Sequence, residues 1–164
     1  MSRSAILNAT IQNQLKLADI ETAEEAGAVL TLTRTAVLAI TTAGTTITWQ
    51  QEIRGYQITW ATTTVTIPAD GWYIIGLSMQ FSVNLNNVFA VLIVNGVNVQ
   101  SYNGFGDTDR NNFSFSMVRY FSENDAVQLS VFPSANCNLL QVAENGIAES
   151  PILHIVQLSG GVDV

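Results

Sequence analysis

The residues of this chain that are best suited to bind a metal ion are two acids in a loop-like stretch. Asp107 and Asp109 alternate within residues 102–112, which are rich in Gly, Asn and Asp. Alternate carboxylates offer the hard oxygen ligands that Ca²⁺ prefers, but this ion takes about six to eight oxygens. Because two acids make a weak site, we predict a solvated loop, no metal ion and no cofactor.

Groups that could catalyse a reaction are scarce. The chain has one histidine, His154, within the apolar run Ile152–Val156, and one cysteine, Cys137. Catalysis needs several titratable groups that converge, and the sequence contains no Gly-rich phosphate loop, zinc motif or nucleophile elbow. We expect Cys137 to be a small buried residue, and His154 to be structural or a pH-sensitive group at a subunit contact. The protein is therefore not expected to be an enzyme.

The composition is poor in charge. Charged residues make up 12% of the chain, about half the usual share, and apolar residues make up 48%, with a mean hydropathy of +0.26. So much uncharged surface on a small protein suggests that part of it is covered in an oligomer or a larger assembly. The formal net charge of −7 leaves no basic surface for phosphates, so nucleic acid is not an expected partner.

Length and hydropathy limit the organisation further. A chain of 164 residues suits one compact domain. The richest apolar run, Val88–Val94, is far shorter than the roughly 18 residues that a membrane-spanning helix needs. Residues Met1–Thr10 lack the pattern of a secretory signal. We therefore expect synthesis in the cytoplasm and no membrane partner.

The first 27 residues differ from the rest. Ala, Gln, Leu, Lys and Glu dominate Ser4–Ala26, and the three- and four-residue spacing of its apolar positions predicts a helix that Gly27 would end. Acids near the C-terminal end of that helix oppose its dipole. An extended arm on a neighbouring subunit therefore stays open as the alternative. We predict an N-terminal arm over residues 1–27 and a head over residues 28–164.

From Ala28 onward the chain has the composition of a β protein. Thr, Val, Ile and aromatic residues dominate, and Gly, Asn, Asp and Pro cluster between them. Eight to ten short strands with regular turns predict an all-β antiparallel jelly-roll sandwich. The expected strands include Leu30–Leu32, Val37–Ile40, Thr46–Trp49, Gln57–Trp60, Thr64–Ile67, Trp72–Val83, Val88–Val94, Val97–Gln100, Phe113–Phe121, Ala126–Phe132 and Pro151–Leu158.

The turns and the phase of the strands give more specific expectations. Pro68–Gly71 reads as a turn before the long strand Trp72–Val83, which we expect to be central and to pair with Val88–Val94. Asn95-Gly96 is a strong two-residue hairpin signal. In Phe113–Phe121 the phenylalanines share a face with Met117 and Arg119, whereas Val118 and Tyr120 share the other. Of the tryptophans, we expect Trp72 to pack inside, and Trp49 and Trp60 to be the more exposed.

The order of these features resembles a known family over Thr46–Leu158. Val65–Tyr73 resembles that family's proline, glycine and tyrosine entry to its central strand, and Val91–Gly96 resembles its next hairpin. Phe113–Leu129 resembles its strand, acidic turn and strand, and Ser150–Leu158 resembles its closing strand. The family is that of the jelly-roll heads of the complement-component and tumour-necrosis-factor superfamily, including related heads on bacteriophage structural proteins.

This resemblance implies a compact homotrimer. The chain has no collagen-like stalk, and Ile152–Val156 stands where the family usually has Ser-Phe-Ser-Gly-Phe, so an immune-type function is not expected. A short head with an N-terminal arm looks most like a bacteriophage virion protein. The resemblance therefore implies a capsid cement or decoration protein at the virion surface, bound to capsid subunits by its arm. The alternative is the receptor- or carbohydrate-binding head of a tail fibre, with a host surface receptor as partner.

Three groups of residues are the candidates for these contacts. For attachment to the capsid they are Ile6, Leu7, Ile11, Leu15, Leu17 and Ile20. For contact within the trimer they are Phe113, Phe115, Tyr120, Ile152 and His154. For ligand binding by the loop they are Tyr102, Phe105, Asp107, Asp109 and Arg110.

Overall fold

The computed structural model describes residues 27–105, 111–144 and 147–158, and all of its regular elements in these ranges are strands. One compact unit spans Ala28–Leu158. The predicted arm lies outside the described residues, apart from Gly27, as do its six attachment candidates. Among the described residues, no helix has the length and apolarity that a membrane crossing requires.

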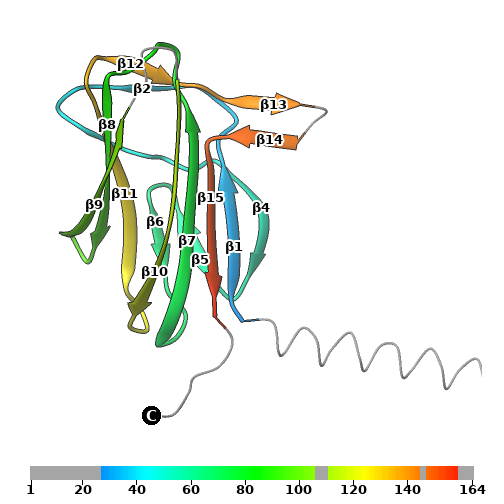
Figure 1. The fold of residues 1–164 in the computed structure, drawn as a ribbon. Helices are drawn as coiled ribbons and strands as arrows, with labels where there is room; N and C mark the ends of the chain where they lie inside the picture. The colour runs from blue at the N-terminus through cyan, green and yellow to red at the C-terminus, as the bar shows by residue number, and fades with distance from the viewer. Residues whose placement is uncertain (1–26, 106–110, 145–146, 159–164) are drawn as a thin grey trace, which may run out of the picture. The chain divides into compact units, whose positions relative to one another are not determined.

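Two antiparallel sheets face each other as a sandwich (Figure 1). The first sheet has the strand order β10 (Asn112–Phe121), β7 (Gly71–Gln80), β15 (Ile152–Gln157), β1 (Val29–Thr33) and β4 (Gln51–Tyr56). The second sheet has the order β5 (Thr59–Ala61), β6 (Thr64–Thr66), β11 (Ala126–Pro133), β8 (Asn87–Val94) and β9 (Val97–Phe105), and β3 (Thr45–Thr46) also pairs with β11. Two small sheets join β12 (Cys137–Leu139) to β2 (Leu38–Ile40) and β13 (Val142–Glu144) to β14 (Ile147–Ser150).

The core lies between the two sheets, because successive side chains of a strand point to opposite faces. On β7 the buried residues are Tyr73, Ile75, Leu77 and Met79, and they meet Leu92 of β8 and Leu129 of β11 in one apolar cluster. The all-β jelly-roll prediction is confirmed. Strands of two to four residues, such as β3 and β5, raise the number of strands in the described ranges to fifteen, above the eight to ten predicted.

The turn chemistry follows the sequence closely. Asn95 and Gly96 join β8 to β9 with φ values of 52° and 79°, as a two-residue hairpin turn of this kind requires. Asn124 has a φ of 66° in the turn between β10 and β11. The phase of β10 is also as predicted, since Phe113, Met117 and Phe121 are buried. Local patterns therefore predicted the Asn95-Gly96 hairpin and the faces of β10 correctly.

The predicted pairing of the long strand with Val88–Val94 is wrong. β7 pairs with β10 and β15, whereas β8 belongs to the second sheet and pairs with β9 and β11. In this fold the connection between β7 and β8 crosses from one sheet to the other. Consecutive strands of a sandwich need not be neighbours, and the sequence between them carries no signal that distinguishes a hairpin from such a crossing.

The predicted tryptophan environments are reversed for two of the three. Trp49 is buried at 3% exposure, and Trp72 is 55% exposed. Trp72 lies on the outer face of the first sheet, since its neighbour Tyr73 takes the inward position. Trp60 is half-buried, and its indole N–H donates to Glu52 Oε2 at 2.9 Å.

Several segments were assigned wrongly as loops or were missed, and β12, β13 and β14 are among the strands that were not predicted. Residues 102–105 continue strand β9, so the predicted loop does not begin at Tyr102. Strand β4 was not predicted, because all six of its residues are exposed and its sequence therefore shows no apolar alternation. Conversely, the predicted strand Thr46–Trp49 is a strand only at Thr46.

Candidate subunit-contact face

The outer face of the first sheet carries the strongest candidate site. Strand pairing places its side chains in rows that run across the strands. One row joins Val118 of β10, Ile74 of β7, Val156 of β15, Val29 of β1 and Tyr56 of β4. Trp72 and Tyr120 face each other in the adjoining row. We call six of these residues the apolar strip: Tyr56, Trp72, Ile74, Val118, Tyr120 and Val156.

The apolar strip is exposed to an unusual degree. Its side chains are between 37% and 56% exposed, and none of the six carries a charge. Trp72 and Tyr120 pack edge to face with ring centroids 5.7 Å apart, so two of the three aromatic side chains support each other at one end of the strip. Contiguous exposed apolar surface of this kind marks an interaction site in soluble proteins.

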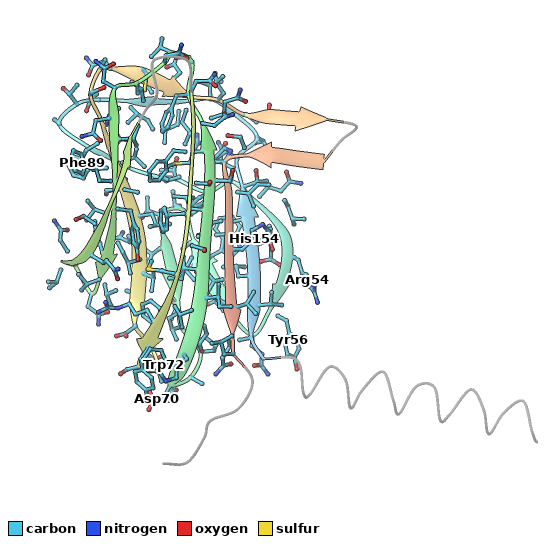
Figure 2. All side chains as sticks on the ribbon, in the orientation of Figure 1. Arg54, Tyr56, Asp70, Trp72, Phe89 and His154 are labelled. Atoms are coloured by element: carbon cyan, nitrogen blue, oxygen red, sulfur yellow. The ribbon has the colours of Figure 1, made fainter. Side chains whose placement is uncertain are left out.

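A polar row borders the apolar strip. It runs from Ser116 through Gly76, His154 and Thr31 to Arg54. His154 Nδ1 and Thr31 Oγ1 form a hydrogen bond at 3.0 Å, which orients the imidazole on the surface. Figure 2 shows His154 of β15 and Arg54 of β4 at this side of the molecule, with β1 between the two strands. Within this row there is open space above Gly76, because the atom nearest to a Cβ added there would be His154 Cβ, at 3.9 Å.

The structure divides the five predicted trimer contacts between two places. Tyr120, Ile152 and His154 lie on the outer face of the first sheet: Tyr120 belongs to the apolar strip, His154 to the polar row, and Ile152 to the row beyond the polar row. Phe113 and Phe115 lie on the opposite face of β10. Phe113 is buried, and Phe115 is half-buried at the edge where β10 approaches β9.

Of the five residues predicted to bind a ligand in the loop, Tyr102 is the one whose side chain the structure describes. Its ring stacks on Phe115 with centroids 4.3 Å apart, so it belongs to the edge of the sandwich. Burial raises the pKa of the Tyr102 hydroxyl, and the charge of Arg119 opposes that shift. Phe105 ends strand β9, while Asp107, Asp109 and Arg110 lie outside the described residues.

Sequence reasoning missed most of the apolar strip. Trp72, Ile74, Val118 and Tyr56 were not among the predicted contact residues. A signal was present in β7, where residues of both phases are apolar over Trp72–Ile75. A strand that is apolar on both faces is expected to be covered on both faces.

In the part of the chain that the structure describes, other reactive groups do not converge on one site. Cys137 is partly buried against the core, and burial raises the pKa of its thiol, which disfavours the reactive thiolate. Over residues 27–105, 111–144 and 147–158, no group of three or more His, Cys, Asp and Glu side chains is placed to hold a metal ion. The calcium hypothesis for Asp107 and Asp109 concerns residues that the structure does not describe.

Comparison with solved structures supports the fold. Murine APRIL crystallised at pH 5.0 matches with a TM-score of 0.59 and 16% sequence identity, over 80% of this chain and 99% of its own. Eiger TNF from S. frugiperda matches with a TM-score of 0.60 and 12% identity, over 84% of this chain and 96% of its own. No family model matches the sequence, and neither does any curated protein. At these identities the similarity establishes a TNF-like jelly-roll fold.

Proposed function

We propose that this chain is a homotrimeric structural protein of a bacteriophage virion, and that it acts as a capsid cement or decoration protein. The observation that carries the proposal is the apolar strip on the outer face of the first sheet. Six uncharged side chains exposed to solvent on a small acidic protein favour association with further subunits.

The trimer would bring this strip of one subunit against its neighbours. The resemblance to the complement-component and tumour-necrosis-factor superfamily supports three copies, since heads of that family form compact trimers. The aromatic stack of Tyr102 and Phe115 lies at the edge of the sandwich on the inner side of β10, whereas the strip residues of β10 lie on its outer face. In a closed ring each subunit has two contact surfaces, and we assign the strip and this edge to those roles.

Residues 1–27 would supply attachment to the capsid. Their composition differs from that of the head, and their apolar positions, from Ile6 to Ile20, offer anchor points for a capsid subunit. The resemblance to heads on bacteriophage structural proteins supports a virion location. No catalytic role is proposed, because the proposal needs only binding surfaces.

The experiment that tests this function compares the full chain with a truncated chain that begins at Ala28. Light scattering gives the mass of each in solution, and co-sedimentation with undecorated capsids measures attachment. We expect both chains to be trimers and only the full chain to sediment with capsids. Attachment that survives the truncation would contradict the role of the arm, and a monomeric full chain would contradict the trimer.

A further inference from the structure

The second sheet differs from the first in its chemistry. None of the residues in its strands β3, β5, β6, β8, β9 and β11 is Asp, Glu, Lys or Arg. Its outward positions carry hydroxyl and amide side chains such as Asn98, Ser101, Asn103 and Gln128, next to the apolar side chains of Phe89, Val91 and Ile93 on β8. A sheet face that meets solvent without a single charge is unusual, because about a quarter of the residues in an average protein are charged.

A hollow of about 320 Å³ lies on this sheet. It is lined by Val91, Asn98, Val99, Gln100 and Ser101. Its volume is at the lower end of the range for small-molecule sites, which is roughly 300 to 1,000 Å³. The hollow therefore has room for part of a small ligand, such as one or two rings.

A β-bulge lies among the residues that line the hollow. Leu92 pairs with Gln100 and Ile93 pairs with Asn98, so Val99 is an extra residue in strand β9. Val99 packs against the core. Asn98 and Ser101 hold outward positions opposite Ile93 and Val91, and the bulge puts two residues between them in place of the usual one.

The polar groups around the hollow match a partner rich in hydroxyls. Amide and hydroxyl side chains such as Asn98 and Ser101 both donate and accept hydrogen bonds, as sugar hydroxyls do. Both residues are exposed, so these groups are available to a ligand. The absence of Lys and Arg from the sheet strands disfavours sulfated or sialylated partners, which need a cation for their charge.

An aromatic side chain extends the site along the strand. Phe89 is 40% exposed and lies two residues before Val91 on the same outward face of β8, about 7 Å away along the strand. An exposed aromatic ring offers an apolar face on which the C–H groups of a sugar ring can pack. Figure 2 places Phe89 on the side of the molecule away from His154 and Arg54, so a subunit contact at the first sheet leaves it open.

We propose that the hollow over the bulge of β9, with Phe89 beside it, binds a neutral oligosaccharide. Asn98 and Ser101 exchange hydrogen bonds with sugar hydroxyls, Val91 forms the apolar wall, and Phe89 packs against an adjoining ring. The proposal does not depend on the trimer or on capsid attachment. Its site lies on the sheet opposite the apolar strip.

Binding of the full chain to an array of neutral, sialylated and sulfated glycans tests this proposal. We expect binding to neutral glycans that changes little between low and high salt, because no ion pair is involved. Ser101→Arg fills the hollow with a long charged side chain and should weaken binding at least tenfold. The matched control is Thr59→Arg on the same sheet, since Thr59 is exposed on β5 at the opposite edge and should leave binding unchanged.

A second measurement detects binding that is too weak for the array, and a second variant replaces one that does not fold. Nuclear magnetic resonance titration with lactose, maltose and cellobiose should shift the amide signals of residues 98–101 before those of β5. If Ser101→Arg fails to fold, Asn98→Ala takes its place, because Asn98 is exposed and its truncation spares the core. A null array with no shifts at residues 98–101, binding confined to acidic glycans, or equal losses in Ser101→Arg and Thr59→Arg would each overturn the proposal.

Discussion

Tyr102 of β9 and Phe115 of β10 stack with their ring planes within 5° of parallel and their centroids 4.3 Å apart. The two strands belong to different sheets, and each is the last strand of its sheet. Phe115 also packs edge to face on Phe113, with centroids 5.8 Å apart. Aromatic rings therefore close this edge of the sandwich, where β9 and β10 belong to different sheets and do not pair with each other.

Removal of one ring from this edge should loosen the sandwich. Phe115→Ala deletes the ring that both Tyr102 and Phe113 contact, and we expect a loss of about 2 kcal/mol in the free energy of unfolding, less than for a fully buried phenylalanine. Urea unfolding at a fixed protein concentration measures it. Tyr102→Phe keeps the stacked ring and serves as the control, so an equal loss in both variants would show that the stack does not matter.

A side chain also links two turns at the end of the molecule. Asn95 Nδ2 donates to Asp125 Oδ1 at 2.7 Å, and Asn95 Oδ1 accepts from the Ala126 amide at 2.9 Å. Asn95→Gly keeps the positive φ of the turn but removes both hydrogen bonds. We expect it to lower the free energy of unfolding by about 1 to 2 kcal/mol. Asn95→Ala adds backbone strain at a φ of 52° and should cost more, as equilibrium unfolding would show.

Those local features explain which parts of the fold were predictable. The turn at Asn95-Gly96 follows from two residues that tolerate positive φ, and the phase of β10 follows from alternation within one strand. Neither depends on the rest of the chain. The overall jelly-roll class follows from the number of such strands and turns.

The pairing of the strands and the candidate face depend on distant residues. β7 lies between β10 and β15, and β15 is more than 70 residues away along the chain, so its register is set by packing of the whole sheet. Trp72 and Tyr73 are both large and aromatic, and either could take the inward position by composition alone. In the structure Tyr73 points inward, and its hydroxyl donates a hydrogen bond to the Ala69 carbonyl at 2.9 Å. Trp72, as the adjacent residue along the strand, therefore points outward.

Two glycines with positive φ should respond differently to the same substitution. At Gly44, with a φ of 97°, an added Cβ would lie 2.2 Å from the Phe132 ring, whereas at Gly96 nothing lies within 4 Å. Gly96→Ala should therefore cost only the backbone strain, about 1 kcal/mol, and Gly44→Ala should cost clearly more. Thermal unfolding of the two variants side by side checks this, and equal melting temperatures would contradict the close packing at Phe132.

Stability should fall at high pH through Tyr73. Burial, the largest cause, raises the pKa of its hydroxyl above the ordinary value of 10.0. The folded chain thus holds this proton more tightly than the unfolded chain, so the stabilisation is complete below pH 10 and is lost as the pH rises through the folded pKa. We expect the free energy of unfolding of the wild type to fall above pH 10 more steeply than that of Tyr73→Phe. Parallel curves for the two proteins in urea unfolding from pH 8 to pH 11 would rule out this contribution.

The apolar strip offers a direct test of the assembly. Val118 is 56% exposed within the strip, and Val97 is 61% exposed at the start of β9 in the other sheet, so the two valines are matched in size and exposure. If the strip is buried between subunits, Val118→Glu places a carboxylate in each contact, and burial of an unpaired charge opposes association. We expect light scattering to give the mass of a monomer for Val118→Glu and of a trimer for Val97→Glu, with circular dichroism unchanged in both. A trimer of Val118→Glu would show that this face of the first sheet is not the subunit contact, and monomers of both variants would point to a general effect of added charge.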